Sequence, residues 1–579
     1  MQLSAKTFIH AFQQQAARTP DRIALSDATK VNITYGQAQK YANYVSQKLT
    51  DAGVQRGDIV ALFLGRTAFF PVAAIGVFQA GAAYMPIDPR YPDSRIAFML
   101  EDSEAKVLIA SAEFAAHIEG FTGTVLYAED LQVERQETPE PIIDGDDRDY
   151  IIYTSGTTGK PKGVINVHKG LMNLIDFYAA ELNCNENDVS GVYCSFAFDA
   201  SVMQIFPFLA RGAGVDIVPT EVMLDMRALN AYTNEHGITT MYLNPSVAKF
   251  FDLVCENTTL KSVVTAGDRL TYGPGRNFVI YNMYGPTEAS AVITSFLVDK
   301  KYENYPIGKF VKNNCGYIVD ESMKLVAEGE AGELCLAGIH VGTGYLRRPE
   351  LTAEKFIKNP FSDDANYQTL YRSGDLCRVL PDGNYEFLGR IDTQVKIRGF
   401  RVELGEIEAA MRSYEGTRDA ICGAFEDETR GEKYIVGYYV ADTVLDEPSF
   451  REFLAGSLPF YMIPTAFVKL DAIPLDVNGK FDRKALIRPD YTVATSAAAE
   501  FRGETQEEQV LADCLFEIFD TKHLDFDRSF IEAGGDSLAT IHLIGLLLQK
   551  GFTMGGLSAI FSPEHSLRDI ARFLVPYTS

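Results

Sequence analysis

The sequence lacks the features that tie a protein to a membrane or to nucleic acid. It has no run of about 18 apolar residues, the length that a membrane-spanning helix needs. Its first residues lack the charged, apolar and small-residue segments of a secretory signal. Lys and Arg are not clustered, and 53 basic against 78 acidic residues give a net charge of −25. We therefore expect a cytoplasmic protein that binds neither membranes nor nucleic acid.

Paired cysteines are also missing. None of the eight cysteines forms a C-x-x-C pair, and they are scattered along the chain. A disulfide framework or a zinc site is therefore not expected. We predict reduced thiols that pack in cores.

The length and the order of patterns predict several domains. With 579 residues, the chain is several times longer than a typical single domain. Up to about residue 390, helical segments (7–19 and 71–80) alternate with apolar strands (59–63 and 107–110). This alternation favours α/β layers around buried sheets. The expected large α/β domain spans residues 1–391.

The pattern changes after residue 390. Strands at 394–398 and 434–440 mix with helices at 405–414 and 448–457, which predicts a smaller α+β domain over residues 392–490. Residues 491–503 are rich in Ala, Thr and Ser and are predicted to be a linker. Helical periodicity at 505–519 and 537–549 predicts an all-α helical bundle over residues 504–579.

The clearest chemical signal is the segment YTSGTTGKPKG at 153–163. Its glycines and hydroxyls allow backbone N–H and side-chain O–H groups to close around phosphate oxygens. Lys160 and Lys162 add positive charge. It is not a Walker A loop, because Lys160 is followed by Pro161 rather than by Ser or Thr.

This loop and eight further motifs, in order, resemble the adenylation domains of nonribosomal peptide synthetases, which belong to the adenylate-forming enzymes. The resemblance covers nearly the whole chain. One departure is Ser373 where that family usually has Thr, a change that keeps the hydroxyl. The motifs are AGAAYMPID (80–88), FDAS (198–201), NMYGPTE (282–288), GELC (332–335), YRSGDL (371–376), GRIDTQVKIRG (389–399), LPFYMIP (458–464) and NGK (478–480).

The C-terminal segment FIEAGGDSL at 530–538 resembles a peptidyl carrier domain. In that family the serine after Gly-Gly-Asp receives 4′-phosphopantetheine, so Ser537 is the expected attachment site. A serine at a helix N-terminus meets free N–H groups that favour a phosphodiester. The resemblance thus implies a large and a small adenylation subdomain, a linker and a carrier domain.

The resemblance implies two half-reactions that use ATP and Mg²⁺. A carboxylate attacks the α-phosphorus of ATP to give an aminoacyl adenylate and pyrophosphate. The phosphopantetheine thiol then attacks the adenylate and releases AMP. Lys480 is the expected bridge between the substrate carboxylate and phosphate, Glu288 is the expected Mg²⁺ ligand, and Lys396 is expected to enter the site for the second step.

The resemblance also assigns nucleotide contacts. Thr154 and Thr158 are expected to touch phosphate, Asp375 and Arg390 the ribose, and Tyr284 the adenine. The hinge between the two subdomains is expected at Asp392, since hinges concentrate a large φ/ψ change in a few residues. The full predicted ATP-binding set is Thr154, Ser155, Gly156, Thr157, Thr158, Gly159, Lys160, Asn282, Tyr284, Gly285, Thr287, Asp375 and Arg390.

The amino-acid pocket is the most informative part for the substrate. Asp199 is expected to pair with an α-ammonium group, while the rest of the lining is neutral and mostly apolar. We expect a hydrophobic amino acid, with Val, Leu or Ile favoured because Tyr242 occupies part of the cavity, and Phe or Met left open. The predicted lining, besides Lys480, is Asp199, Ala200, Met203, Tyr242, Val264, Ala266, Met283, Ala291 and Val292.

Two alternatives remain beside amino-acid loading. One is an acyl- or aryl-CoA ligase, against which Asp199 and the Ser537 segment argue. The other is a non-catalytic scaffold of the same fold, against which the intact Lys480, Glu288 and Asp375 argue. The expected partners of a loading enzyme are its amino acid, a phosphopantetheinyl transferase and downstream synthetase domains for condensation or termination.

Overall fold

The computed structural model describes residues 6–488 and 503–576, except for 29–30, 141, 157–158, 224, 255, 257, 398, 428–431, 476–480, 520–523, 531–532, 534, 536, 555–559 and 561–564. The chain forms two compact units. One joins Met1–Pro219 to Thr233–Arg483, and the other joins Thr220–Tyr232 to Lys484–Ser579.

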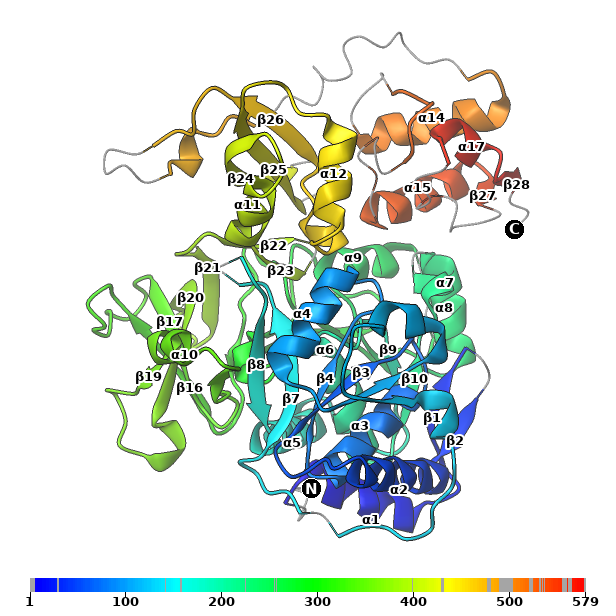
Figure 1. The fold of residues 1–579 in the computed structure, drawn as a ribbon, viewed down its shortest axis with the longest axis vertical. Coiled ribbons are helices and arrows are strands. Elements are labelled where there is room, and N and C mark those ends of the chain that lie inside the picture. The colour runs from blue at the N-terminus through cyan, green and yellow to red at the C-terminus, as the bar shows by residue number, and fades with distance from the viewer. Residues whose placement is uncertain are drawn as a thin grey trace. The chain divides into compact units, whose positions relative to one another are not determined.

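Two large sheets, mostly parallel at their centres, dominate the first unit (Figure 1). The nine-stranded sheet runs in the order β15 (Lys309–Phe310), β14 (Thr294–Leu297), β13 (Val279–Tyr284), β12 (Ser262–Thr265), β11 (Thr240–Tyr242), β9 (Val189–Val192), β10 (Gly214–Ile217), β1 (Ile23–Asp27) and β2 (Asn32–Thr34). The seven-stranded sheet runs β18 (Gly344–Tyr345), β8 (Lys162–Val167), β7 (Arg148–Thr154), β4 (Ala83–Pro86), β3 (Ile59–Phe63), β5 (Val107–Ala110) and β6 (Thr124–Tyr127).

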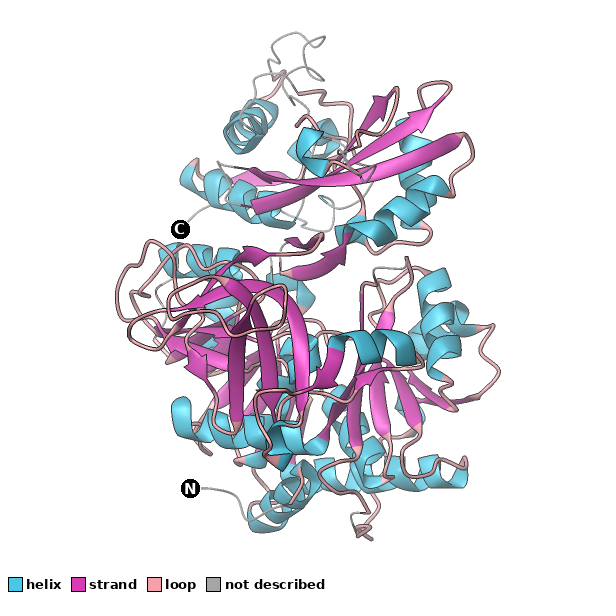
Figure 2. Ribbon diagram, turned by 90° about the vertical axis from the view of Figure 1, so that its left-hand side faces the viewer, coloured by secondary structure: helices cyan, strands magenta, loops and turns pink. Residues whose placement is uncertain are grey.

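Helices cover these sheets, and Figure 2 shows them in cyan against the magenta strands. Every residue of α3 and α6 is buried, which is typical of helices enclosed on all sides. The expected large α/β core is therefore confirmed. The helices of the first unit are α1 (Phe8–Arg18), α2 (Tyr35–Asp51), α3 (Phe69–Gln79), α4 (Asp93–Ser103), α5 (His168–Glu181), α6 (Ala200–Ala210) and α9 (Pro245–Val254). Helix α7 (Thr220–Met223) and most of α8 (Met226–Glu235) belong to the second unit.

A smaller, antiparallel five-stranded sheet follows in the chain. It contains β16 (Asn314–Val319), β17 (Gly332–Gly338), β20 (Thr369–Val379), β19 (Phe356–Lys358) and β21 (Tyr385–Arg390), with α10 (Pro349–Lys355) before β19. The described residues also contain short 3-10 helices: η1 (Ala112–Ile118), η2 (Ala128–Asp130), η3 (Thr287–Ala289), η4 (Ala365–Tyr367), η5 (Phe460–Met462) and η6 (Arg483–Ala485).

Mixed strands and helices occupy the residues after 390, as the pattern predicts. The hairpin of β22 (Gln394–Ile397) and β23 (Phe400–Glu403) leads into α11 (Leu404–Arg412). A three-stranded sheet of β24 (Thr417–Asp427), β25 (Glu432–Ala441) and β26 (Ala466–Leu470) follows, with α12 (Glu447–Ala455) between its last two strands.

The second unit contains the helices predicted near the C-terminus. These are α14 (Gln506–Phe519), α15 (Ser537–Gln549) and α17 (Leu567–Ala571). The expectation of an all-α bundle needs a correction, because β27 (Phe552–Met554) pairs with β28 (Leu574–Pro576). Three-residue strands are too short to show a strand period in the sequence. The predicted linker at 491–503 lies almost entirely outside the described residues.

The structure bears on two expectations, those about membrane-spanning helices and about the cysteines. Among the residues that the structure describes, no helix is both long and apolar enough to span a membrane. Seven of the eight cysteines are described; all seven carry free thiols, and five of them are buried.

One buried carboxyl group on the strand that leads to the phosphate loop makes the fold sensitive to pH. Asp149 of β7 is fully buried; its Oδ1 accepts the Tyr150 N–H at 2.7 Å, and its Oδ2 finds no partner among the described residues. Burial raises the pKa of Asp149 well above its ordinary value. The protonated form is therefore favoured in the folded state, and stability falls as pH rises from about 4.

We expect Asp149→Asn to stabilise the fold at neutral pH. The difference in unfolding free energy from wild type should grow with pH, by about 1.4 kcal/mol per unit between the unfolded and folded pKa values. Melting temperatures at pH 5, 6 and 7 measure it, with exposed Asp146→Asn as the control. A difference that does not change with pH would contradict the assignment.

Candidate active site

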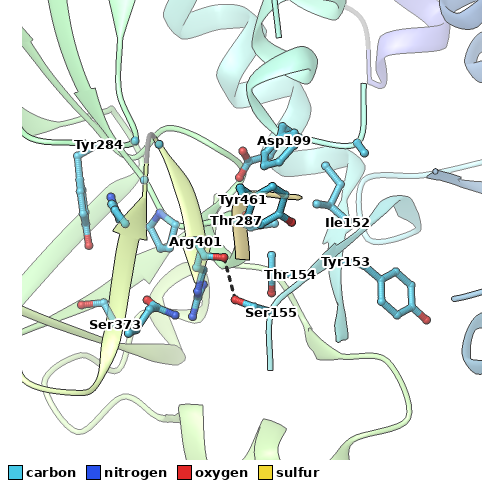
Figure 3. Close-up of a pocket in the computed structure, with 18 of the residues that line it drawn as sticks. Ile152, Tyr153, Thr154, Ser155, Asp199, Tyr284, Thr287, Ser373, Arg401 and Tyr461 are labelled. Atoms are coloured by element: carbon cyan, nitrogen blue, oxygen red, sulfur yellow. Dashed lines mark hydrogen bonds between the residues drawn. The ribbon is translucent and has the colours of Figure 1, made fainter. Parts of the chain in front are cut away.

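A cavity lies where the large sheets, the five-stranded sheet and the β22–β23 hairpin meet (Figure 3). Its volume of about 100 Å³ is below the ~300–1,000 Å³ of pockets that hold small molecules, because the hairpin inserts side chains into it. Its lining includes Thr154, Ser155, Asp199, Tyr284, Gly285, Thr287, Ser373, Asp375, Arg390, Gln394, Lys396, Arg401 and Tyr461.

The predicted phosphate loop forms the turn between β7 and β8. At Gly156 a Cβ atom would lie 1.9 Å from the Lys160 carbonyl oxygen, so this tight turn requires glycine. Gly159 has a φ of +81°, which also favours glycine. Thr157 and Thr158 lie outside the described residues.

One hydroxyl of this loop is suited to a ligand oxygen. Thr154 Oγ1 is buried and has no hydrogen-bond partner within the described parts of the chain. A buried hydroxyl without a partner is unfavourable, and a phosphate oxygen would satisfy it. The neighbouring Ser155 is already engaged, since its Oγ donates to the Arg401 carbonyl at 2.9 Å (Figure 3) and accepts the Glu403 N–H at 3.1 Å.

The two lysines of the loop have different surroundings. Lys160 Nζ lies 5.6 Å from the centre of the Phe98 ring. Lys162 is buried, with Nζ 4.7 Å from the centre of the Tyr345 ring. Burial lowers the pKa of Lys162 to about 8, although the nearby Glu288 opposes the shift. Lys162 is therefore a buried cation beside the loop, whereas Lys160 is exposed to solvent.

Glu288, in η3, is completely buried and ionised. Its Oε1 accepts the Tyr345 hydroxyl at 2.7 Å and its Oε2 accepts Arg401 Nη1 at 2.7 Å. Burial alone would raise the pKa of Glu288, but Arg401 and Lys162 outweigh it and lower the pKa to about 2. This buried carboxylate follows Thr287 of the cavity lining and provides the hard oxygen donors that Mg²⁺ prefers.

The predicted ribose and adenine residues form one hydrogen-bonded group. Asp375 in β20 accepts the Tyr284 hydroxyl at 2.5 Å and Arg390 Nη1 at 2.6 Å. Arg390 also pairs with Asp392, the predicted hinge residue, at 2.5 Å. The structure thus brings together Tyr284, Asp375 and Arg390, which are separate in sequence.

Lys396 of β22 enters this group. Its Nζ lies 5.9 Å from the centre of the Tyr284 ring. Burial lowers the pKa of Lys396, and the carboxylates of Asp375 and Asp268 oppose that shift. Lys396 therefore lines the cavity, and its role in the second step stays a prediction.

Asp199 immediately precedes α6 and lines the cavity. Its side chain forms no capping bond to that helix, and Figure 3 shows it beside Thr287. Burial raises the pKa of Asp199, while a hydrogen bond donated by the Thr287 hydroxyl opposes the shift. The carboxylate has thus lost hydration without gaining a full counter-charge.

Of the residues predicted to line the amino-acid pocket, Asp199 lines this cavity, and the other described ones are packed together in one hydrophobic cluster. Tyr242, Val264 and Met283 lie at the carboxyl ends of β11, β12 and β13, where α/β proteins commonly bind ligands. The Tyr242 hydroxyl donates to the Ala266 carbonyl at 3.1 Å, which fixes the ring in the wall. The remaining predicted members, all in the same buried cluster, are Ala200, Met203, Ala266, Ala291 and Val292.

Two other predicted residues support the site's backbone. Asn282 Nδ2 donates to the Pro306 carbonyl at 2.8 Å. A Cβ at Gly285 would lie 2.5 Å from the Ala291 carbonyl oxygen. Lys480 lies outside the described residues.

Sequence reasoning missed three charged residues at the site. Arg401 lies two positions past the GRIDTQVKIRG motif, and Arg95 and Glu406 fall in no quoted motif. Arg95 Nη1 and Glu406 Oε1 form a 2.8 Å ion pair with side chains only 2% and 3% exposed. Charged side chains on otherwise apolar faces of α4 and α11 were the available signal.

Comparison with known proteins assigns the chain to a family. Residues 12–346 match the family described as AMP-binding enzyme, so the chain belongs to that family of adenylate-forming ligases. Bacitracin synthase 1 of Bacillus licheniformis is 38% identical over 570 residues, which are 98% of this chain and 11% of the synthase. Tyrocidine synthase 1 of Brevibacillus parabrevis is 36% identical over 94% of this chain and 50% of its own length. The chain thus spans half or less of these relatives.

A solved structure is similar along most of the chain. An artificially fused adenylation–PCP didomain of a nonribosomal peptide synthetase from Klebsiella oxytoca matches with a TM-score of 0.71 and 25% identity. The match covers 90% of this chain and 98% of that one. The large N-terminal α/β core is therefore that of an adenylation domain.

Proposed function

We propose that this chain activates an amino acid as its aminoacyl adenylate and loads it onto its own C-terminal carrier domain, in nonribosomal peptide synthesis. The observation that carries the amino-acid part is Asp199. Its carboxylate lines the cavity, where Lys396 attracts it only weakly, and an α-ammonium group would supply a full counter-charge. The similarity to synthetases named for peptide products supports the same assignment.

Each residue in and around the cavity can be assigned a role in this reaction. The substrate carboxylate attacks the α-phosphorus of ATP, and pyrophosphate leaves. Thr154 and the loop backbone would hold phosphate oxygens, Asp375 and Arg390 the ribose, and Tyr284 the adenine. Glu288 would hold Mg²⁺, which when bound neutralises charge on the phosphates. Positioned cations and donors are the main contribution that a protein makes to such a displacement.

The division of the chain follows from this proposal. Residues 1–391 form the large adenylation subdomain, 392–490 the small one, 491–503 the linker and 504–579 the carrier. Ser537 is the first residue of the 13-residue helix α15, and a Cβ at Gly535 would lie 2.3 Å from the Phe530 ring. A serine that starts a helix after a tight glycine turn fits a phosphodiester. The attached phosphopantetheine would provide the accepting thiol.

The proposed substrate is an uncharged, hydrophobic amino acid. Beyond Asp199 the predicted pocket is apolar, and a charged side chain there would lose hydration without gaining a partner. Tyr242 would occupy part of this pocket, which favours Val, Leu or Ile over larger side chains. Since one methylene changes binding by only ~1–3 kcal/mol, several related amino acids should be accepted.

Exchange of labelled pyrophosphate into ATP tests the proposal. Each of the twenty amino acids and a panel of carboxylic acids is offered to the full chain. We expect exchange with one or a few hydrophobic amino acids. Exchange with acids that lack an amine would favour a CoA ligase, and no exchange with any substrate would favour a scaffold.

Asp199→Ala should lower kcat/KM for the preferred amino acid about a hundredfold or more, since one partner of a buried charge pair is removed. The loss should be far smaller for the matching des-amino acid, which leaves the wild-type carboxylate unpaired. Both substrates are measured with both proteins. An equal proportional loss would show that Asp199 maintains structure and does not recognise the amine.

A further inference from the structure

The end of β23 and the start of α11, residues 401–406, place two opposite charges in the site at once. Arg401 reaches Glu288, and Glu406 reaches the phosphate loop. Both contacts join the segment after residue 392 to the large core. Their positions coincide with those expected for the two parts of a magnesium–phosphate ligand.

The first contact occupies the predicted metal ligand. Glu288 Oε2 accepts Arg401 Nη1 at 2.7 Å, while Tyr345 holds Oε1. Burial disfavours the Arg401 cation, but the attraction of Glu288 outweighs it and raises the Arg401 pKa. The Arg401 cation thus lies against Oε2 of Glu288. Its positive charge opposes the binding of Mg²⁺ at the same carboxylate, so we expect the guanidinium to leave when the metal ion binds.

The second contact occupies the predicted phosphate loop. The Gly156 N–H, one of the loop donors expected to hold phosphate, donates to Glu406 Oε2 at 3.1 Å. The other oxygen of Glu406 pairs with Arg95 at 2.8 Å, and both side chains are almost fully buried. The Glu406 carboxylate thus lies where the loop is predicted to bind a phosphate oxygen, and Arg95 is its counter-charge.

The backbone between these side chains is fixed to the same loop. Ser155 Oγ donates to the Arg401 carbonyl at 2.9 Å and accepts the Glu403 N–H at 3.1 Å. These bonds hold the backbone of the segment against the loop, so undocking the segment breaks them together with the Arg401 and Glu406 contacts. The segment docks or leaves as one piece.

We propose that residues 401–406 imitate a magnesium–pyrophosphate unit, with Arg401 in place of the metal ion and Glu406 in place of a phosphate oxygen. Docking of this segment and binding of magnesium pyrophosphate then exclude each other. The inference rests on the proposed function, because it uses the nucleotide roles of Glu288 and the loop. Pyrophosphate must leave before the segment can dock, and Mg·ATP must displace it before the next cycle.

Competition of this kind has a measurable consequence. If only a fraction of the molecules has the segment undocked, the apparent dissociation constant for magnesium pyrophosphate is the intrinsic one divided by that fraction. Weakening the docked state therefore tightens binding of the ligand. No new contact to the ligand is required.

Arg401→Gln is the decisive variant. It removes a positive charge from an anion site, so electrostatics alone predicts weaker binding of pyrophosphate. The competition predicts the opposite, a dissociation constant lowered on the order of threefold to tenfold. Calorimetric titration of the full chain with pyrophosphate in excess Mg²⁺ measures it. Unchanged or weaker binding by a folded Arg401→Gln variant would overturn the proposal.

Glu406→Gln tests the second contact and should tighten binding as well. Because it leaves Arg95 without its counter-charge, its melting temperature is recorded alongside. Arg418→Gln and Glu447→Gln are matched controls, since both change the same charges in ion pairs within the segment after residue 392. The controls should leave the dissociation constant unchanged. A similar gain in a control would show a general charge effect instead.

A structural signal separates release of the segment from a change in affinity alone. The chain has no Trp, so Phe400→Trp introduces a single emitter whose ring faces Phe198 of the core, 4.9 Å between centroids for the native phenyl. Magnesium pyrophosphate should shift its emission to the red. The same ligand should leave Phe453→Trp unchanged, since Phe453 packs on Tyr414 of its own subdomain. No shift at position 400 would overturn the proposal.

Amide hydrogen exchange across residues 394–403 of the unsubstituted chain also reports release of the segment. The rate of amide exchange should rise when magnesium pyrophosphate is added.

Failure of this inference is distinct from failure of the proposed function. If amino-acid-dependent exchange of pyrophosphate into ATP proceeds while Arg401→Gln binds pyrophosphate as the wild type does, only the inference fails. If neither exchange nor pyrophosphate binding is found, the proposed function fails.

Discussion

Lys480→Ala should lower the rate of adenylate formation about 100- to 1,000-fold and leave the fold intact. The size is that expected when one preorganised group that stabilises developing charge is removed. In the proposed reaction, charge moves from the attacking carboxylate to the phosphate oxygens, and a single cation between them stabilises both. Amino-acid-dependent pyrophosphate exchange measures the loss.

The surroundings of Lys480 explain why the fold should survive. Residues 476–480 connect Leu475 and Phe481, which form an antiparallel bridge, and the Asp482 N–H donates to the Pro474 carbonyl at 2.9 Å. These contacts are made by flanking residues, so removing the lysine side chain leaves them in place. Lys469→Ala, in the neighbouring β26, is the matched control. Near-normal pyrophosphate exchange by a folded Lys480→Ala variant would contradict the assignment of Lys480 as the catalytic cation.

The local pattern was sufficient to predict many elements. The strand at 107–110 has the predicted bounds, since four consecutive apolar residues between polar ones are typical of a buried parallel strand. The helix at 537–549 also matches its prediction. In both cases the signal lies within the element itself. Tertiary contacts were not needed to find it.

Other features depend on contacts that no local pattern encodes. The Arg401–Glu288 pair joins residues 113 apart, and the Gly156–Glu406 bond joins residues 250 apart. The motifs predict that Glu288 binds a metal ion and that Gly156 binds phosphate. They do not predict that Arg401 and Glu406 of the same chain contact these residues. The docked arrangement of residues 401–406 decides which partner each has. Only the structure shows it.

The same contrast applies inside the nucleotide site. Asp375 was predicted to bind ribose hydroxyls, and its oxygens are held here by Tyr284 and Arg390. Two donors already arranged around this buried carboxyl group hold it in one orientation. A nucleotide that takes their place would find an acceptor in position. The Asp375 side chain is thus paired by the protein's own groups, whereas Asp199 in the same cavity has no full counter-charge.

Ser537→Ala should abolish covalent loading completely and leave amino-acid-dependent pyrophosphate exchange unchanged. The adenylation residues all precede position 491 in the proposed division, so a change at the start of α15 leaves them intact. The attachment hydroxyl is lost, and alanine keeps the helix because its helix propensity is high. The helix should therefore fold without the site of modification.

Two measurements separate this loss from unfolding. Intact mass is recorded after treatment with a phosphopantetheinyl transferase and coenzyme A, and should rise by one group for wild type and for a Thr553→Ala control but not for Ser537→Ala. Labelled amino acid is then offered with ATP, and label should remain on the first two proteins only. The mass test depends on the serine alone, whereas the label test also needs adenylation. Label on a Ser537→Ala protein whose mass had not risen would mean that another group accepts the amino acid, and the carrier assignment would be wrong.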